Sequence, residues 1–180
     1  MESNTKCDPP PRTGGHSSLN VALRVLLFSA SLVALIVMVT AKETKHIVTR
    51  GYHVSMKAKY DMTPANIYFV VAASVVCLYS IMSTVASLAR KSKPALYLHL
   101  ICLDALMLGV MAAATGTAGG VAYVGLKGNK HAGWNKVCST FGTYCKHVGS
   151  AVALSLVASI ILVLLIFVSA VSLHRRVPRD

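Results

Sequence analysis

Two charged side chains inside long apolar runs, Arg24 and Asp104, are the residues of this chain best suited to do chemistry. An ionised group in the hydrocarbon of a bilayer costs at least about 2.5 to 3.5 kcal/mol unless it is paired or reaches water. Opposite charges at such sites are typical of a structural ion pair or of a polar path for ions or protons. We expect Arg24 to pair with Asp104. The alternative is that Arg24 extends to the membrane surface while Asp104 is protonated or faces a cavity.

Two further groups bear on this chemistry. His99 precedes Asp104 by five positions, which does not quite place both on one helix face, so a proton relay has only weak support. Cys138 and Cys145 are seven positions apart, and on an unbroken helix their Cα atoms would be about 10 Å apart, beyond the roughly 7 Å limit for a disulfide. A disulfide therefore requires a bend, for example at Gly142. Two free thiols are the alternative.

The sequence has no pattern typical of an enzyme or of a cofactor site. It contains no glycine-rich phosphate loop, no nucleophile elbow, no histidine pair at metal-binding spacing and no Cys-x-x-Cys. Glu43 and Asp61 are the only acidic residues in the loops between the apolar runs. We therefore predict no catalysis, no cofactor and no metal.

Four apolar runs must position the two charges, and each is close to the length that crosses a bilayer. A hydrocarbon core of about 30 Å needs roughly 20 helical residues. The chain of 180 residues is 54% hydrophobic and only 13% charged, which is typical of a protein dissolved in lipid. We predict an all-α fold, a bundle of four transmembrane helices. The expected segments are a disordered tail over 1–18, helices over 19–41, 64–89, 95–126 and 148–173, exterior loops over 42–63 and 127–147, a link over 90–94 and a tail over 174–180.

The basic residues suggest how the chain sits in the membrane. The net charge is +12, and almost all lysines and arginines lie between or beyond the apolar runs, where they can contact anionic lipid headgroups. Totals on the two sides of the membrane are nearly equal, but the density is highest in the short link and at the carboxyl end. We therefore place both termini in the cytosol. Scattered basic residues without an aromatic strip or zinc spacing argue against nucleic-acid binding.

Small residues recur at four-residue spacing in the third apolar run. Gly109 and Ala113 follow Ala105 on one ridge, and Gly116 and Gly120 follow Ala112 on the next. This spacing lets helices approach closely. We expect it to serve packing inside the bundle; a contact between copies of the protein is the alternative.

These residues together give the chain a resemblance to the plant Casparian strip membrane protein-like family, which is related to the four-span MARVEL proteins. The matching features cover nearly the whole chain: Arg24 within Leu-Arg-Val-Leu-Leu-Phe, Lys57 to Asp61, Pro64-Ala65, Tyr68 to Ala72, Asp104, Gly128-Asn129, Trp134, Val137-Cys138, Phe141 and Tyr144-Cys145. The resemblance implies a plasma-membrane protein with cytosolic termini that forms homo-oligomers and hetero-oligomers with related four-span proteins. It also implies the arginine–aspartate pair, and in barrier-forming members it implies platforms that gather cell-wall enzymes.

The expected function is that of a membrane scaffold. The second exterior loop would present Trp134, Phe141 and Tyr144 to exterior partners, while the first loop, Glu43 to Asp61, is basic and lacks the acidic, phenylalanine-rich signature of the barrier-forming members. That difference argues against lignin patterning. A small transporter or channel with Asp104, His99 and Arg24 in a polar path is the alternative. An adhesion protein of the claudin or tetraspanin type lacks support because the first loop has no cysteine.

Overall fold

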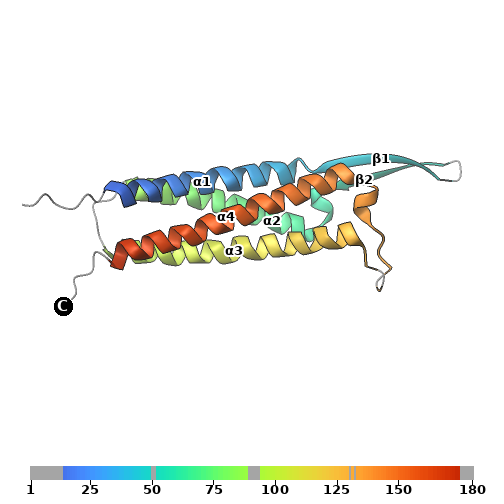
Figure 1. Ribbon diagram of the computed structural model, residues 1–180. Coiled ribbons are helices and arrows are strands. Elements are labelled where there is room, and N and C mark those ends of the chain that lie inside the picture. The colour runs from blue at the N-terminus through green and yellow to red at the C-terminus, as the bar shows by residue number, and fades with distance from the viewer. Residues whose placement is uncertain (1–13, 50–51, 89–93, 130, 132, 175–180) are drawn as a thin grey trace, which may run out of the picture.

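A computed structural model shows four long helices side by side (Figure 1). It describes residues 14–49, 52–88, 94–129, 131 and 133–174. The helices are α1 (Gly14–Val39), α2 (Pro64–Leu88), α3 (Pro94–Lys127) and α4 (Gly142–His174). All four are long and apolar enough to cross a membrane, which confirms the predicted fold class. The expected segments that fall on 1–13, 89–93 and 175–180 lie outside the described residues.

The helices form an up-and-down bundle in which each packs mainly against its sequence neighbours, and α4 closes the ring against α1. Short connections favour antiparallel neighbours, as in other four-helix bundles. Consequently α1 and α3 run in the same direction, and residues at matching depth in these two helices can meet across the bundle.

The helix ends differ in part from the sequence prediction. Pro64 and Pro94 open α2 and α3, where a missing N–H costs nothing because the first N–H groups of a helix have no partner within it. However, α1 begins at Gly14 inside the expected disordered tail, and α4 begins at Gly142, inside the expected exterior loop rather than at residue 148. Hydropathy marks where a chain can enter lipid, and these helices continue past that limit through polar residues.

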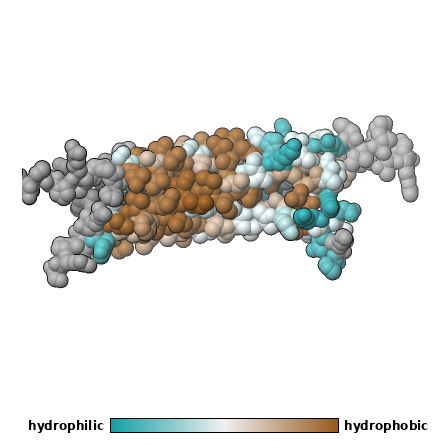
Figure 2. All heavy atoms as spheres, viewed as in Figure 1, coloured by the Kyte–Doolittle hydropathy of each residue, from teal (hydrophilic) through white to brown (hydrophobic). Residues whose placement is uncertain are grey.

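The interior of the bundle is tightly packed with small and medium side chains. Fully buried members of this core are Leu27, Ala34, Met38, Ala41, Phe69, Ala73, Val76, Met111, Ala114, Ala118, Ala151, Ala158, Leu162 and Leu165. Many leucine, isoleucine and valine side chains of all four helices instead face outward. Figure 2 shows a broad apolar band on the face in view. An apolar surface of this extent is typical of contact with lipid.

The first connection is a β-hairpin, where the sequence predicted only a polar loop. Strands β1 (Lys42–Thr49) and β2 (Tyr52–Lys59) pair antiparallel, with Lys42 opposite Lys59. The hairpin projects beyond the helices (Figure 1). At its base the backbone N–H of Tyr60 donates to the carbonyl of Ala41 at 3.2 Å, and a short 3₁₀ turn, η1 (Tyr60–Met62), leads into α2.

The second connection is compact. Gly128 has φ of +72°, a conformation that favours glycine, and its α-carbon faces the carbonyl of Trp134 so closely that a side chain there would clash. Asn129 and Trp134 exchange backbone hydrogen bonds at 3.0 and 2.9 Å. A 3₁₀ turn, η2 (Val137–Ser139), then returns the chain to the start of α4.

Candidate functional site

Arg24 of α1 and Asp104 of α3 meet inside the bundle. Nη2 of the guanidinium lies 3.0 Å from Oδ2 of the carboxylate, and Nη1 lies 3.3 Å from Oδ1. Both side chains have 0% exposed surface. The two parallel contacts match the fork of arginine to the two oxygens of a carboxylate, which gives both charge neutralisation and a fixed orientation. The structure thus brings together the two charges singled out in the sequence.

Three uncharged polar residues extend this pair to all four helices. The hydroxyl of Tyr79 on α2 donates to Oδ1 of Asp104 at 2.5 Å, and Nε of Arg24 donates to Oδ1 of Asn20 at 3.0 Å. The amide of Asn20 in turn donates to Oγ of Ser169 on α4 at 3.0 Å. We refer to Asn20, Arg24, Tyr79, Asp104 and Ser169 as the polar network. Its bonds join each helix of the bundle to at least one other.

The polar network satisfies the charges by direct protein contacts. Asp104 accepts bonds from an arginine and a tyrosine, and Arg24 donates from Nε, Nη1 and Nη2. Removing one partner of a buried ion pair leaves an uncompensated charge and costs about 3 to 5 kcal/mol. The network can therefore hold four helices in one register, since each helix would lose a bond if it slid past its neighbours.

His99 does not belong to this network, because it is exposed on the surface of α3. A polar path made of Arg24, His99 and Asp104 would require the three side chains to share a water-accessible route. The structure instead separates an exposed histidine from a pair that has no exposed surface.

The opposite end of the bundle, where the hairpin emerges, is fastened differently. Cys138 and Cys145 form a disulfide with their Cα atoms 5.7 Å apart. The separation is shorter than a continuous helix would give because the chain turns through η2 and starts α4 at Gly142 between the two cysteines. Cys77, which is buried, and Cys102, which is exposed, are free thiols.

Glu43 ties the hairpin to the start of α4. Its Oε2 accepts a bond from the backbone N–H of Tyr144 at 2.9 Å, and its Oε1 lies 3.3 Å from Nζ of Lys45. The first N–H groups of a helix have no helical acceptor, and a negative charge is favoured there. The bond from Tyr144, together with Lys45, holds the pKa of Glu43 below its ordinary value of 4.5.

The three residues expected to present themselves to exterior partners have different surroundings. Trp134 is 65% exposed, as such a contact requires. Phe141 is only 7% exposed, so its expected role as an exterior contact is wrong. Tyr144 is half-buried, and its hydroxyl accepts a bond from Nδ2 of Asn66 at 2.8 Å. Phe141 lies directly before α4, where its backbone N–H donates to the carbonyl of Val137 in the preceding turn, and Tyr144 lies in the first turn of α4, which starts earlier than expected. We call Glu43, Asn66, Cys138, Tyr144 and Cys145 the clasp.

The small residues of α3 face away from the bundle. Gly109, Ala113, Gly116 and Gly120 are all exposed, and a Cβ atom added at any of the three glycines would meet nothing within 4 Å. The expectation that they pack inside the bundle is therefore wrong. The buried side of α3 is formed by other residues, among them Met111, Ala114 and Ala118. The alternative, that these residues form a contact between copies of the protein, is consistent with their exposure.

Sequence reasoning missed Tyr79, Asn20 and Ser169, and the residues themselves explain why. Uncharged polar side chains are common in membrane helices, where a hydroxyl can bond to the backbone of its own helix, as Ser74 and Ser80 do here. One signal was present in Asn20, which lies four residues before Arg24 and so on the same helix face.

The fold and the polar network define a multi-pass membrane protein of the four-helix type. The sequence comparisons make this more specific. The pattern of the Casparian strip membrane protein domain matches residues 13–161. "CASP-like protein 1D1" of Populus trichocarpa is 50% identical over 94% of this chain and 89% of its own length, and "CASP-like protein 1D1" of Vitis vinifera is 53% identical over 92% and 82%. "CASP-like protein 1D2" of Glycine max is 49% identical over 99% and 94%. No solved structure matches the chain significantly.

The chain belongs to the Casparian strip membrane protein-like family, as its resemblance in sequence indicated. The matched region ends inside α4 but includes every residue of the clasp and four of the five residues of the polar network. The clasp and the polar network therefore lie on the part of the chain that the family pattern matches, except for Ser169.

Proposed function

We propose that the protein is a plasma-membrane scaffold, with both termini in the cytosol, that self-associates laterally through α3 and has no catalytic activity of its own. Related four-span proteins would join the same assemblies. The exterior surface, on which Trp134 is 65% exposed, would hold wall-facing partners such as cell-wall enzymes.

The observation that carries this proposal is the outward-facing strip of small residues on α3, formed by Ala105, Gly109, Ala112, Ala113, Gly116 and Gly120. Small residues at four-residue spacing allow two helix backbones to approach closely in lipid. A lipid chain gains little from such a strip, whereas a second helix gains many van der Waals contacts along it. The tightly joined bundle supplies the rigid surface on which the strip is displayed.

The polar network supports a scaffold better than a transporter. Transport through the bundle would require Arg24 and Asp104 to exchange with water during each cycle, and both are fully buried and bonded to each other. The substrate sites of secondary transporters are typically formed by helices that are interrupted near the middle of the membrane. By contrast, α1, α2, α3 and α4 are each one uninterrupted α-helix.

A substitution at Gly116 tests the self-association. Gly116→Leu fills open space and replaces glycine in a helix by a better helix former, so the monomer should keep its stability. We expect the association constant of the protein in lipid vesicles, measured by energy transfer between labelled copies, to fall about tenfold, the effect of losing roughly 1.4 kcal/mol at the contact. Ala153→Leu, at an exposed small residue of α4, is the matched control and should leave the oligomer intact. Equal oligomer fractions in wild type and Gly116→Leu would refute the assignment of α3.

The orientation has a separate test. Attaching a protease-cleavable tag to each terminus and another in the hairpin distinguishes the two sides of the membrane in sealed cells. We expect external protease to remove only the hairpin tag. Removal of the terminal tags would reverse the proposed orientation, and retention of protein in internal membranes would contradict the plasma-membrane location.

A further inference from the structure

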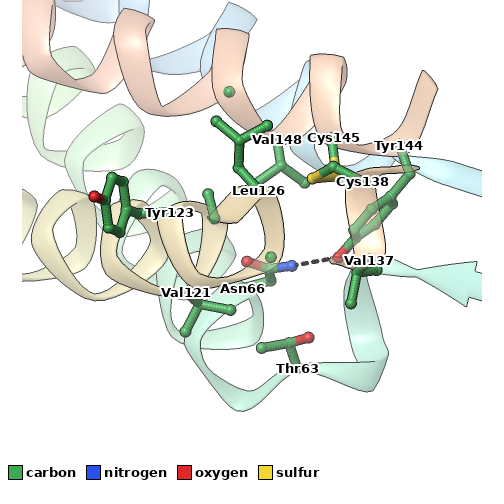
Figure 3. A pocket seen from close by; sticks show the side chains of 13 residues that line it. Thr63, Asn66, Val121, Tyr123, Leu126, Val137, Cys138, Tyr144, Cys145 and Val148 are labelled. Atoms are coloured by element: carbon green, nitrogen blue, oxygen red, sulfur yellow. Dashed lines mark hydrogen bonds between the residues drawn. A yellow bond between two sulfur atoms is a disulfide. The ribbon is translucent and has the colours of Figure 1, made fainter. Parts of the chain in front are cut away.

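A cavity of about 390 Å³ lies beside the clasp, between the ends of α2, α3 and α4 (Figure 3). Its walls are mainly apolar and include Val121, Leu126, Val137 and Val148, with the disulfide of Cys138 and Cys145 on one side. The volume equals that of about 13 molecules of liquid water. One bridging water would leave most of it empty, and apolar walls offer a water cluster few hydrogen bonds. The size lies within the range of sites for small organic ligands, roughly 300 to 1,000 Å³.

One polar atom of this cavity has no partner within the part of the chain that the structure describes. Asn66 is 2% exposed, and its Oδ1 accepts no hydrogen bond. The other end of the same amide is fixed, because Nδ2 donates to the hydroxyl of Tyr144. Figure 3 shows the carbonyl oxygen of Asn66 pointing away from Tyr144, among the cavity residues. A buried acceptor without a donor costs free energy comparable to a lost hydrogen bond, so the site favours a ligand that brings one donor.

The lining residues define the rest of that ligand. None of the described residues that line the cavity is Lys, Arg, Asp, Glu or His, so these residues would offer a phosphate or carboxylate headgroup no counter-charge. Asn66 lies 22 residues before Leu88 at the other end of α2, a distance of about 33 Å along the helix, which places it near the edge of a hydrocarbon core of about 30 Å. At that depth a lipid keeps its polar head, and its apolar body extends toward the bilayer centre.

We propose that this cavity binds an uncharged membrane lipid of the sterol class, whose hydroxyl donates a hydrogen bond to Oδ1 of Asn66 while its ring system lies against the apolar walls. A single hydroxyl matches Oδ1 of Asn66, the one buried acceptor that lacks a partner among the described residues. A rigid, compact body loses little conformational entropy on binding, whereas flexible two-chain lipids must order their chains to enter a cavity of this size.

The experiment uses the full chain reconstituted in phosphatidylcholine vesicles that contain a photoreactive, click-tagged sterol. We expect saturable labelling that maps by mass spectrometry to the end of α3 or the start of α4. Asn66→Leu removes the acceptor and should lower the apparent affinity about tenfold, as expected for the loss of one hydrogen bond. Tyr68→Leu, at an exposed position of the same helix and outside the cavity lining, is the matched control, and labelling should stay near the wild-type level.

A second pair of variants tests the cavity without touching the polar atoms. Gly149 lines the cavity and has open space around its α-carbon, so Gly149→Leu should fill the site and abolish specific labelling. Ser150→Leu, at the next position of the same helix and outside the cavity lining, is the matched control and should have no effect.

Three outcomes would overturn the proposal. The first is labelling that both Asn66→Leu and Gly149→Leu leave unchanged. The second is competition by unlabelled ceramide or diacylglycerol as effective as that by unlabelled sterol. The third is an experimental density map in sterol-containing lipid in which the cavity holds ordered water only. Because Gly149→Leu adds a good helix former, it keeps the test valid even if Asn66→Leu fails to fold.

Discussion

The two ends of the bundle are fastened by different chemistry. At the end where α1 begins and α4 ends, the polar network joins the helices through an ion pair with 0% exposed surface and three uncharged partners. At the hairpin end, the clasp combines a covalent disulfide with a carboxylate at the start of α4 and an amide bonded to a phenol. One end depends on electrostatics within lipid, and the other depends on a covalent bond and on contacts that reach water.

The surroundings of each end explain the difference. In hydrocarbon, separated charges cannot be solvated by water, so separating an ion pair costs much free energy and the pair holds the helices without a covalent link. If the same ion pair were exposed to water, it would stabilise the fold by only about 0 to 1 kcal/mol. There a disulfide fixes the chain regardless of solvent, and in our proposed orientation it lies on the oxidising side, where disulfides persist. Substitutions at the two ends should therefore respond to different conditions.

The largest effect should come from the polar network. Asp104→Ala strands the buried charge of Arg24, and we expect the free energy of unfolding in bicelles to fall by about 3 to 5 kcal/mol. The double variant Arg24→Leu/Asp104→Ala removes both charges and should recover much of that loss. The cycle of single and double variants isolates the pair. Equal losses in Asp104→Ala and in the double variant would show that the charges do not depend on each other.

The next effect concerns the disulfide. Replacing Cys138 and Cys145 by serine opens a short loop, and the chain-entropy relation gives a loss of about 2 kcal/mol. Reductant should produce the same loss in the wild type and none in the serine variant. Cys102→Ser, at an exposed free thiol, is the control. If reductant left the free energy of unfolding of the wild type unchanged, the disulfide would not stabilise the hairpin end of the bundle.

A smaller effect is expected for the tyrosine of the network. Tyr79→Phe deletes one hydrogen bond to the Asp104 carboxylate, which remains paired with Arg24, so we expect a loss of about 1.5 kcal/mol. Tyr68→Phe, at an exposed position on α2, should change the free energy of unfolding little. In the Asp104→Ala background the effect of Tyr79→Phe should disappear, and persistence there would place Tyr79 outside the network.

The smallest effect is a pH dependence confined to the clasp. The folded pKa of Glu43 is depressed, so its contribution is fully present above its ordinary value of 4.5 and is lost as the pH falls through the lower folded value. Amide hydrogen exchange of the hairpin should therefore accelerate between about pH 5 and pH 3, after correction for the intrinsic rate. Glu43→Gln should show fast exchange already at the higher pH. A hairpin that exchanges identically in both proteins would mean that this carboxylate does not fasten it.

The charged residues of the network could be predicted from the sequence, and their partners could not. Arg24 and Asp104 are conspicuous because every other residue of their runs is uncharged. Tyr79 and Ser169 look like ordinary members of an apolar helix, since what distinguishes them is their direction in three dimensions. The orientation of these side chains is set by how the helices pack, and a single polar residue in an apolar helix forms no sequence pattern from which that packing can be predicted.

The direction of the small residues on α3 was unpredictable for a related reason. In water, an apolar face identifies the inside of a protein, but in lipid both faces of a helix are apolar. Ala114 and Ala118 turn inward and Ala113 and Gly116 turn outward, although all four are equally small. The hairpin was missed because the first five residues of β1, Lys-Glu-Thr-Lys-His, are all polar and show none of the apolar alternation that usually marks a strand.

The length of the hairpin sets how far from the lipid the protein can act. Eight residues in each strand extend about 27 Å. The headgroup layer on one side of a bilayer is only about 5 to 8 Å thick, so the far ends of the strands, at Thr49 and Tyr52, stand well clear of it. A ligand held there would be kept at a fixed height above the surface, and shortening both strands by the same number of residues would lower that height without altering the buried helices.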